Sequence, residues 1–173
     1  MKKEIFEWIK TIVISLIIAL VITTFMKPTI VKHYSMQPTL QENDFLIINR
    51  LLYKQGNPER GDIIVFESNQ MDNNGDQKLL IKRIIALPGE ELEIRGGQVY
   101  INEELLQEPY LEDDYTHGNI HQVIPPNTLF VMGDHRNNSL DSRNEDLGLV
   151  DFDDIVGKAF VRLYPFSEIG IIE

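Results

Sequence analysis

The chain contains a nine-residue run that is typical of a buried β-strand: Leu79-Leu80-Ile81-Lys82-Arg83-Ile84-Ile85-Ala86-Leu87. A Lys-Arg pair interrupts this apolar run at its centre. Strand alternation sends Lys82 and Arg83 to opposite faces, so one could point outward while the other lies near the core. A buried, unpaired ammonium group is costly and tends to lose its proton. Lys82 is therefore a candidate general base.

A candidate nucleophile lies earlier in the chain, in the run Tyr34-Ser35-Met36-Gln37-Pro38-Thr39-Leu40. A serine hydroxyl is a weak nucleophile unless a base takes its proton. A lone serine near a proline is more often a simple turn residue, but Ser35 stands only nine residues after an apolar segment that ends at Met26. Ser35 and Lys82 together predict a Ser/Lys dyad hydrolase that works at a membrane surface.

The apolar segment has the length of a membrane anchor. Thr11 to Met26 is free of charged residues. As a helix it would span about 24 Å, and Lys10 and Lys27 can snorkel at its ends. A cleaved signal peptide is the alternative, but the segment ends in large residues without a small-x-small exit. We therefore expect an uncleaved, single-pass anchor and cytoplasmic tip over residues 1–27. Three lysines precede the apolar segment and two follow it closely, and this small excess of positive charge favours a cytoplasmic N-terminus.

The remaining residues, 28–173, are enough for one extracytoplasmic domain of ordinary size. Residues 1–34 hold five lysines and two glutamates, a net charge of +3, so a total of −11 leaves −14 for the rest. An acidic domain argues against a nucleic-acid partner, because phosphate contacts need clustered Lys and Arg. The chain has no cysteine, which excludes disulfides, thiolate metal sites and cysteine nucleophiles.

Most of this domain is strand-like, with little helical periodicity. Two alternating runs are joined by Gly96-Gly97, which is typical of a tight hairpin. Polar stretches are expected to be loops at 68–78 and 108–126. The expected strands are 45–48, 63–66, 79–87, 91–95, 98–101, 129–132 and 158–164, with a helical turn near 50–54. The sequence thus predicts a mainly β fold, an antiparallel β-sheet catalytic domain preceded by one transmembrane helix.

A third segment is rich in side-chain donors and acceptors: Gly133-Asp134-His135-Arg136-Asn137-Asn138-Ser139-Leu140-Asp141-Ser142-Arg143. It follows an expected strand. It could be a solvated loop, but it also suits a polar network that orients a catalytic base. In an extended chain, Asp141 and Arg143 could pair on one face.

The four histidines leave other interpretations open. Any of them could supply the base of a Ser-His-Asp triad, and Asp134 stands beside His135. His117 and His121 could be read as a metal pair. Gly118 lies between them and no helical pattern gives them a shared face, so we expect no metal and no cofactor.

Together, the three segments resemble the type I (leader) signal peptidases. Residues 35–40 look like that family's nucleophile box, 81–90 like its lysine box and 133–143 like its C-terminal box. Their order and the preceding anchor also match, so the resemblance covers nearly the whole chain. A single anchor without a large inserted β domain is similar to the enzymes of Gram-positive bacteria.

This resemblance implies a membrane-bound serine endopeptidase that removes N-terminal signal peptides from exported preproteins. It would cleave after small residues in an Ala-x-Ala pattern. Its partners would be secretory preproteins and the lipid bilayer of the cell membrane, without nucleic acid or metal.

The resemblance also implies roles for individual residues. Ser35 would attack the scissile carbonyl, its backbone N–H would help bind the oxyanion, and Lys82 would be the general base. Ser139 would hydrogen-bond the lysine amine and orient it. Asp141 and Arg143 would form a supporting ion pair. Asp134 would belong to the same polar network as this ion pair. Three apolar residues match positions near the shallow pocket for small side chains: Met36, Leu40 and Ile81.

Two positions depart from the family pattern. His33 stands where the family usually has Gly or Ser, and in some members that serine hydroxyl is the second oxyanion donor. Here an imidazole N–H, a backbone group or water must serve. His135 replaces the asparagine common in the third box.

Two other functions are alternatives. One is another Ser/Lys hydrolase of the same superfamily. The other is a membrane-anchored binding module that keeps the fold without catalysis. The intact Ser35, Lys82 and Ser139 argue against the binding module.

Overall fold

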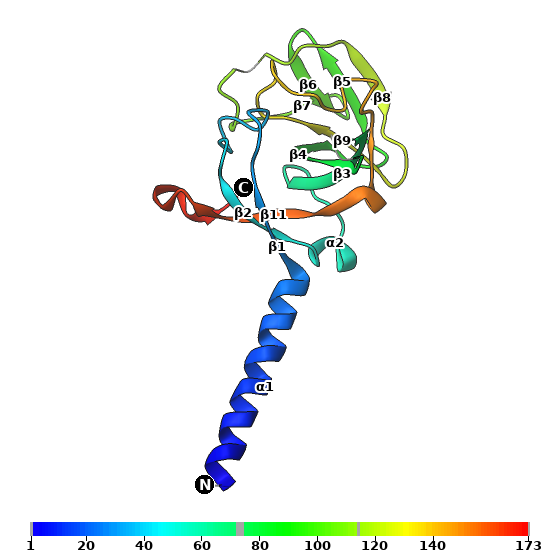
Figure 1. The fold of residues 1–173 in the computed structure, drawn as a ribbon. Helices are drawn as coiled ribbons and strands as arrows, with labels where there is room; N and C mark the ends of the chain where they lie inside the picture. The colour runs from blue at the N-terminus through cyan, green and yellow to red at the C-terminus, as the bar shows by residue number, and fades with distance from the viewer. Residues whose placement is uncertain (1, 72–74, 114, 173) are drawn as a thin grey trace.

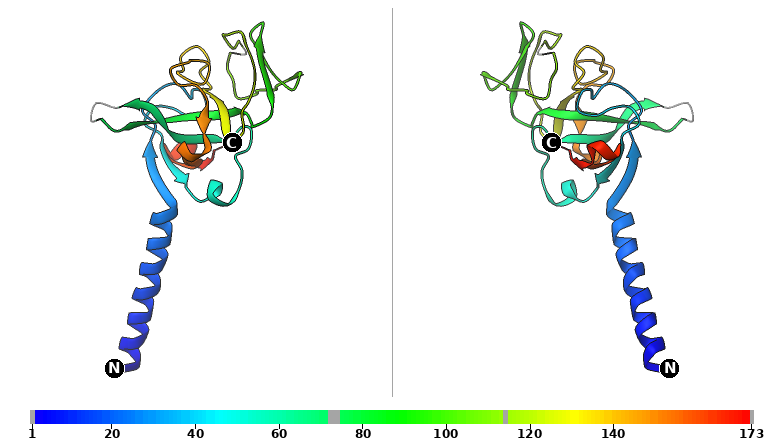
Figure 2. Two further views of the ribbon diagram at one scale, coloured as in Figure 1. Left: turned by 90° about the vertical axis from the view of Figure 1, so that its right-hand side faces the viewer. Right: turned by 90° about the vertical axis from the view of Figure 1, so that its left-hand side faces the viewer.

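One long helix carries a domain built of strands (Figure 1). The computed structural model describes residues 2–71, 75–113 and 115–172. Helix α1 (Lys2–Phe25) leaves the strands as a stalk in both views of Figure 2. Its segment Lys3–Phe25 has a mean hydropathy of 2.3, and none of its side chains for which burial is described is buried in the protein. An apolar helix without protein around it suits a membrane anchor, as expected.

The helix passes directly into the first strand. Strand β1 (Met26–Ile30) starts immediately after α1 and pairs along its whole length with β2 (Phe45–Asn49). The expected boundary after residue 27 therefore falls inside β1.

Two antiparallel sheets form the domain, which confirms the mainly β prediction. The larger has eight strands in the order β1-β2-β11-β3-β4-β9-β10, with β12 beside β11. Its other members are β3 (Ile63–Met71), β4 (Gln77–Ala86), β9 (Thr128–Met132), β10 (Val150–Asp151), β11 (Ile155–Tyr164) and β12 (Gly170–Ile171).

The smaller sheet has four strands in the order β7-β6-β5-β8. They are β5 (Glu91–Arg95), β6 (Gln98–Ile101), β7 (Glu104–Leu105) and β8 (Ile120–Val123). The expected β5–β6 hairpin is confirmed, since Arg95 pairs with Gln98 across two residues. Gly96 and Gly97 have φ values of 58° and 84°, which a two-residue type I′ turn requires and glycine adopts without strain.

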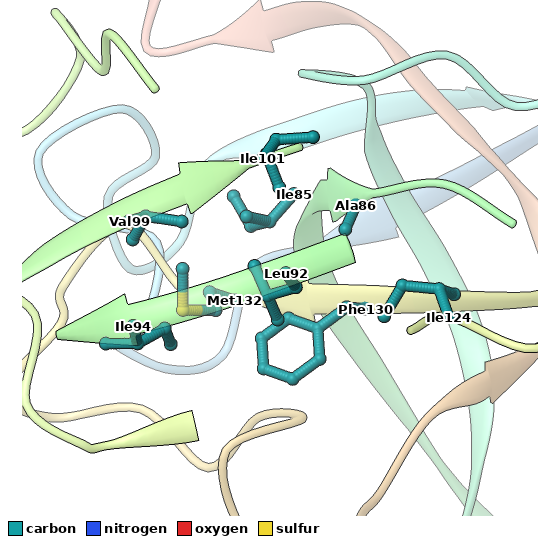
Figure 3. Close-up of a cluster of buried hydrophobic side chains, with 9 residues drawn as sticks. All are labelled: Ile85, Ala86, Leu92, Ile94, Val99, Ile101, Ile124, Phe130 and Met132. Atoms are coloured by element: carbon teal, nitrogen blue, oxygen red, sulfur yellow. The ribbon is translucent and has the colours of Figure 1, made fainter. Parts of the chain in front are cut away.

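An apolar cluster joins the two sheets (Figure 3). Strands β4 and β9 face β5 and β6 there, and all of its side chains are buried. Its members are Ile85, Ala86, Leu92, Ile94, Val99, Ile101, Ile124, Phe130 and Met132. This inter-sheet cluster holds the end of β4 in place.

Strand β4 lies between β3 and β9, and both charged residues at its centre are buried. Lys82 is 3% exposed and Arg83 is 2% exposed. The expectation that one of the pair could point outward was wrong. Each side chain has a polar partner that covers it: Lys82 contacts Ser35, and Arg83 contacts Asp134.

Other differences concern short or polar elements. The expected loop at 68–78 is narrower, because β3 continues to Met71 and β4 starts at Gln77; residues 72–74 lie outside the described residues. The expected loop at 108–126 contains β8. The expected turn near 50–54 is helix α2 (Leu52–Gln55). Two 3-10 turns complete the chain, η1 (Phe152–Asp154) and η2 (Phe166–Glu168).

Leu92→Ala should destabilise the β-sheet domain by about 2–5 kcal/mol, because it opens a cavity in the inter-sheet cluster. The fully buried Leu92 faces β4 and β9 there. Urea unfolding of the full chain in detergent measures this change. Leu105→Ala is the control, since Leu105 is 43% exposed on β7 and should change the free energy of unfolding by less than about 0.5 kcal/mol. Equal midpoints for the two variants would contradict the assigned core.

Candidate active site

Ser35 and Lys82 meet although they lie 47 residues apart in the chain. The Lys82 Nζ donates to Ser35 Oγ at 2.7 Å and to the Ile81 carbonyl at 3.0 Å. The lysine comes from β4, and the serine comes from the turn that follows β1. A nucleophile within hydrogen-bond reach of a candidate base is the geometry that activates a serine hydroxyl.

The surroundings of Lys82 favour its neutral form. Burial is the largest effect and lowers the pKa of the Lys82 amine from 10.5 to about 8. The carboxylates of Asp141 and Asp134 act in the opposite direction, and the charge of Lys78 adds to the lowering. Burial outweighs the two carboxylates, so the amine can act as a base in mildly alkaline solution.

Buried neighbours fix the turn that carries Ser35. Met36 and Leu40 are fully buried in a cluster with Val31 and Leu46. The Ser35 carbonyl accepts the N–H of His135 at 3.0 Å. Ser35 is therefore held by apolar packing on one side and by the third segment on the other.

Gly133 allows this close approach of the third segment. A Cβ atom built on Gly133 would lie 2.3 Å from the Ser35 carbonyl oxygen and 2.3 Å from Ser139 Oγ. Real Cβ atoms do not approach that closely, and one of the two contacts is backbone. Only glycine fits at this position without a displacement of Ser35.

The expected ion pair between Asp141 and Arg143 is present. Arg143 Nε and NH2 donate to the two Asp141 oxygens at 2.8 and 2.9 Å. Asp141 also accepts the Gly133 N–H at 3.1 Å, and Arg143 donates to the Arg136 carbonyl at 2.8 Å. The pair therefore braces the backbone of the segment that contacts Ser35.

Asp134 has different partners from the expected ones. Its carboxylate binds the guanidinium of Arg83 through two hydrogen bonds of 2.9 and 2.8 Å, and it accepts the Thr39 hydroxyl at 2.5 Å. It makes no hydrogen bond to the Asp141–Arg143 pair among the described residues. Asp134 thus links the third segment to β4 and to the Ser35 turn.

Ser139 does not make its expected contact. Its hydroxyl is buried and has no hydrogen-bond partner among the described residues. It lies beside Gly133, while the second contact of the Lys82 amine is the Ile81 carbonyl. The hydrogen bond from Ser139 that would orient Lys82 is therefore absent from this structure.

Known proteins are similar to this chain over nearly its whole length. A family model described as "Signal peptidase, peptidase S26" matches residues 5–164. Signal peptidase I S of Bacillus subtilis (strain 168) is 40% identical over 181 residues, which cover 96% of this chain and 93% of that protein. This chain belongs to the signal peptidase family, peptidase S26.

Two further comparisons concern staphylococcal and enterococcal members of the family. Signal peptidase IB of Staphylococcus aureus (strain COL) is 36% identical over 187 residues, covering 97% of this chain and 94% of that protein. A crystal structure of a signal peptidase I from Enterococcus faecalis V583 is 32% identical, covers 59% of this chain and 96% of that chain, and has a TM-score of 0.49. The signal peptidase I homologues are serine endopeptidases, so the chain is an enzyme of this class.

The pocket residues expected from the family resemblance lie around the dyad but differ in exposure. Met36 and Leu40 are fully buried in the protein, and Ile81 packs against the same cluster while remaining partly exposed. Ile81 is therefore the one of the three that keeps exposed surface.

The histidines do not form the alternative centres. Asp134 binds Arg83 rather than His135, and the His135 Nδ1 atom is buried without a hydrogen-bond partner in the described chain. His121 instead pairs with Glu91, and the His117 ring lies edge-on to Tyr115. Among the residues that the structure describes, no group of three His, Asp or Glu side chains could hold a metal ion.

Two residues of the site were missed in the sequence. Glu108 and Tyr110 lie in the stretch expected to be only a polar loop, yet Glu108 binds the buried Arg136 and the Tyr110 ring covers Arg83. The available signal was the need of Arg136 for a carboxylate partner, because a buried guanidinium requires one.

Lys82→Met should stabilise the protein below pH ~8. The unfolded chain binds a proton at Lys82 more tightly than the fold does, because the folded pKa is depressed from 10.5 to about 8. The penalty is therefore complete below pH ~8, and stability rises with pH until the penalty vanishes near 10.5. Methionine keeps the apolar stem, so the gain should reach up to about 3 kcal/mol and shrink across that window.

Urea midpoints of both proteins in detergent, measured from pH 7 to about 10.5, check this expectation. Two results would mean that the pKa of Lys82 is not depressed in the fold. One is a methionine variant that is less stable than wild type at pH 7, and the other is a stability difference between the two proteins that does not change with pH.

Proposed function

We propose that the chain removes N-terminal signal peptides from exported preproteins, with Ser35 as nucleophile and Lys82 as general base. The observation that carries this proposal is the 2.7 Å contact between the buried Lys82 amine and Ser35 Oγ. Membership of the signal peptidase family supports the substrate class. The dyad supports the way in which the peptide bond is broken.

The reaction begins with neutral Lys82. Its amine takes the proton of Ser35 as Oγ attacks the scissile carbonyl, giving a tetrahedral oxyanion. The resulting ammonium gives that proton to the leaving amine of the mature protein, and the signal peptide remains as an ester on Ser35. Water then attacks the ester while Lys82 accepts a proton from it, and Lys82 passes that proton to Ser35 Oγ as the ester C–O bond breaks, which frees the signal peptide and restores the serine hydroxyl.

The Ser35 backbone N–H is available to the oxyanion. It donates no hydrogen bond to another group within the described chain, and its residue lies in the turn that presents Oγ. A second donor would strengthen the binding of the oxyanion. His33 is exposed two residues away, and its side chain makes no hydrogen bond among the described residues, so its imidazole is free to serve.

Close packing behind the dyad supports selectivity for small residues. Met36 and Leu40 leave no exposed surface, so a substrate side chain next to the scissile bond meets a filled wall beside Ile81. Alanine fits such a shallow site, whereas a large side chain would require the buried core to move. This supports cleavage after an Ala-x-Ala pattern.

The anchor supports cleavage at the membrane surface. Helix α1 ends at Phe25, only ten residues before Ser35, so a membrane-inserted α1 keeps the dyad near the bilayer. In the proposed orientation the N-terminus is cytoplasmic and the catalytic domain lies outside the membrane. Preproteins arriving across the same bilayer then meet the dyad at a raised local concentration.

Ser35→Ala and Lys82→Met should each lower kcat/KM on a preprotein by ~10³-fold or more, because the two groups act as a unit. The assay uses the full chain in detergent and reads the cut site by mass spectrometry. Wild-type kcat/KM should rise about tenfold per pH unit below pH ~8 and level off above it, as Lys82 loses its proton.

Residual activity above roughly a tenth of wild type in either variant would be incompatible with a dyad. A serine-reactive probe that labels wild type but not Ser35→Ala separates an enzyme from a binding module. A pH limb near 6.5 would instead point to a histidine base.

His33 is tested by comparing His33→Ser, His33→Gly and His33→Ala. If the imidazole donates to the oxyanion, serine should retain more activity than alanine, by at most ~2–4 kcal/mol in transition-state stabilisation. The measurement is kcat/KM on one preprotein at pH ~9, where Lys82 is mostly neutral. Equal rates for all three variants would leave His33 only a packing role.

A further inference from the structure

A buried ion pair connects the loop between β7 and β8 to the third segment, residues 133–143. Arg136 NH1 and NH2 donate to the two Glu108 oxygens at 2.9 and 2.5 Å, and NH1 also donates to the Thr116 hydroxyl at 2.6 Å. The Arg136 and Glu108 side chains are 1% and 8% exposed. An ion pair with two hydrogen bonds and so little exposure to water fixes the position of the loop.

Tyr110 connects this ion pair to β4. Its hydroxyl donates to Glu108 Oε1 at 2.5 Å, and its ring lies over the Arg83 guanidinium, with 3.8 Å between the guanidinium carbon and the ring centroid. Burial raises the pKa of the Tyr110 hydroxyl above its ordinary value of 10, so the hydroxyl keeps its proton and remains a donor. The ring is therefore fixed at both its edge and its face.

Both arginines in turn contact the backbone or side chains beside the reacting atoms. Arg83 directly follows Lys82 in β4 and binds Asp134 through two hydrogen bonds. Arg136 Nε donates to the Gly133 carbonyl at 3.1 Å, and Gly133 packs against the Ser35 carbonyl. The loop thus braces the dyad from the base side and from the nucleophile side.

We propose that Tyr110 is a positioning residue of the dyad. Its ring keeps the Arg83 guanidinium in the plane of its two hydrogen bonds to Asp134, and this fixes β4 so that Lys82 lies within hydrogen-bond distance of Ser35. The inference rests on the proposed function only in taking the dyad as the catalytic pair. A guanidinium stacks on an aromatic face while its edge forms two bonds to a carboxylate, and both contacts fix the same plane. The guanidinium also donates to the Gly61 carbonyl at 2.9 Å and to the Thr39 hydroxyl at 3.3 Å, so its edge is held by hydrogen bonds and the Tyr110 ring adds the contact on its face.

The charges that face Lys82 give this role a distinctive signature. They are Asp141, Asp134 and Lys78. Asp134 raises the pKa of Lys82, and the guanidinium of Arg83 offsets its charge. A loosened pair leaves Asp134 less neutralised, so the Lys82 amine should hold its proton to a higher pH.

Tyr110→Leu removes the ring and Tyr110→Phe removes only the hydroxyl. Leucine should lower kcat on a signal-peptide substrate by roughly ten- to hundred-fold, with KM close to wild type, because the base is misplaced rather than the substrate lost. Phenylalanine keeps the stack and should remain near wild type. The control is Tyr100→Leu, which removes a tyrosine stacked on Arg95 at 4.4 Å in the β5–β6 hairpin.

A second measurement does not need a substrate. The full chain is labelled with ¹³Cε-lysine, and the Lys82 signal, identified by its loss in Lys82→Met, is titrated by NMR in detergent. The Lys82 midpoint should move to higher pH in Tyr110→Leu and stay unchanged in Tyr110→Phe and Tyr100→Leu. If wild type cuts no preprotein, the proposed function fails, while this titration still decides the role of Tyr110.

Two results would overturn the proposal. One is wild-type kcat in Tyr110→Leu. The other is a loss of kcat that disappears on cooling while the Lys82 titration stays unchanged, since that marks a merely structural role. If Tyr110→Leu does not fold, Arg83→Lys carries the test, because a lysine keeps the charge but can neither stack flat nor pair doubly with Asp134. It should show the same loss of kcat, and wild-type kcat there overturns the proposal equally.

Discussion

Burial of a single amine is the constraint on which the rest of the site depends. Lys82 is 3% exposed and finds two oxygen acceptors, the Ser35 hydroxyl and the Ile81 carbonyl. Neither is a carboxylate, so neither holds the proton strongly, and desolvation lowers the amine's pKa to about 8. A buried amine needs hydrogen-bond partners from the protein, because water cannot reach it. The Ser35 turn supplies one of them, and the turn and the Gly133 segment together cover β4 at this point.

Two carboxylates near the amine act to raise its pKa and so favour its charged form, and each of them is bound by an arginine. Asp141 pairs with Arg143 and Asp134 pairs with Arg83, in both cases through two hydrogen bonds. The carboxylates can therefore brace backbone and turn without holding Lys82 in its charged form. Buried pairs of this kind contribute little net stability, so their positions are better explained by what they hold in place.

Local patterns in the sequence were enough to predict the apolar helix and most strands, and they singled out Ser35 and Lys82, whose side chains are in contact. An apolar run containing one lysine predicted β4, and Gly96-Gly97 predicted the hairpin. The contacts of Asp134, the free hydroxyl of Ser139 and the stack of Tyr110 could not be predicted, because they depend on which distant elements become neighbours. Asp134 and Arg83 are 51 residues apart, and Tyr110 reaches Arg83 only once the two sheets have packed.

A paired strand, rather than a flexible linker, joins helix α1 to the turn that carries Ser35. Strand β1 begins one residue after α1 ends, and its five residues all pair with β2. The Val31 N–H then bonds the Asp44 carbonyl at 3.0 Å, so the pairing continues toward Ser35. Five residues of strand extend about 17 Å. If α1 spans the bilayer, the height of the dyad is set by this strand and not by the diffusion of a tether. A fixed height suits a substrate whose scissile bond follows its own membrane-spanning segment, because both partners are then measured from the same bilayer surface.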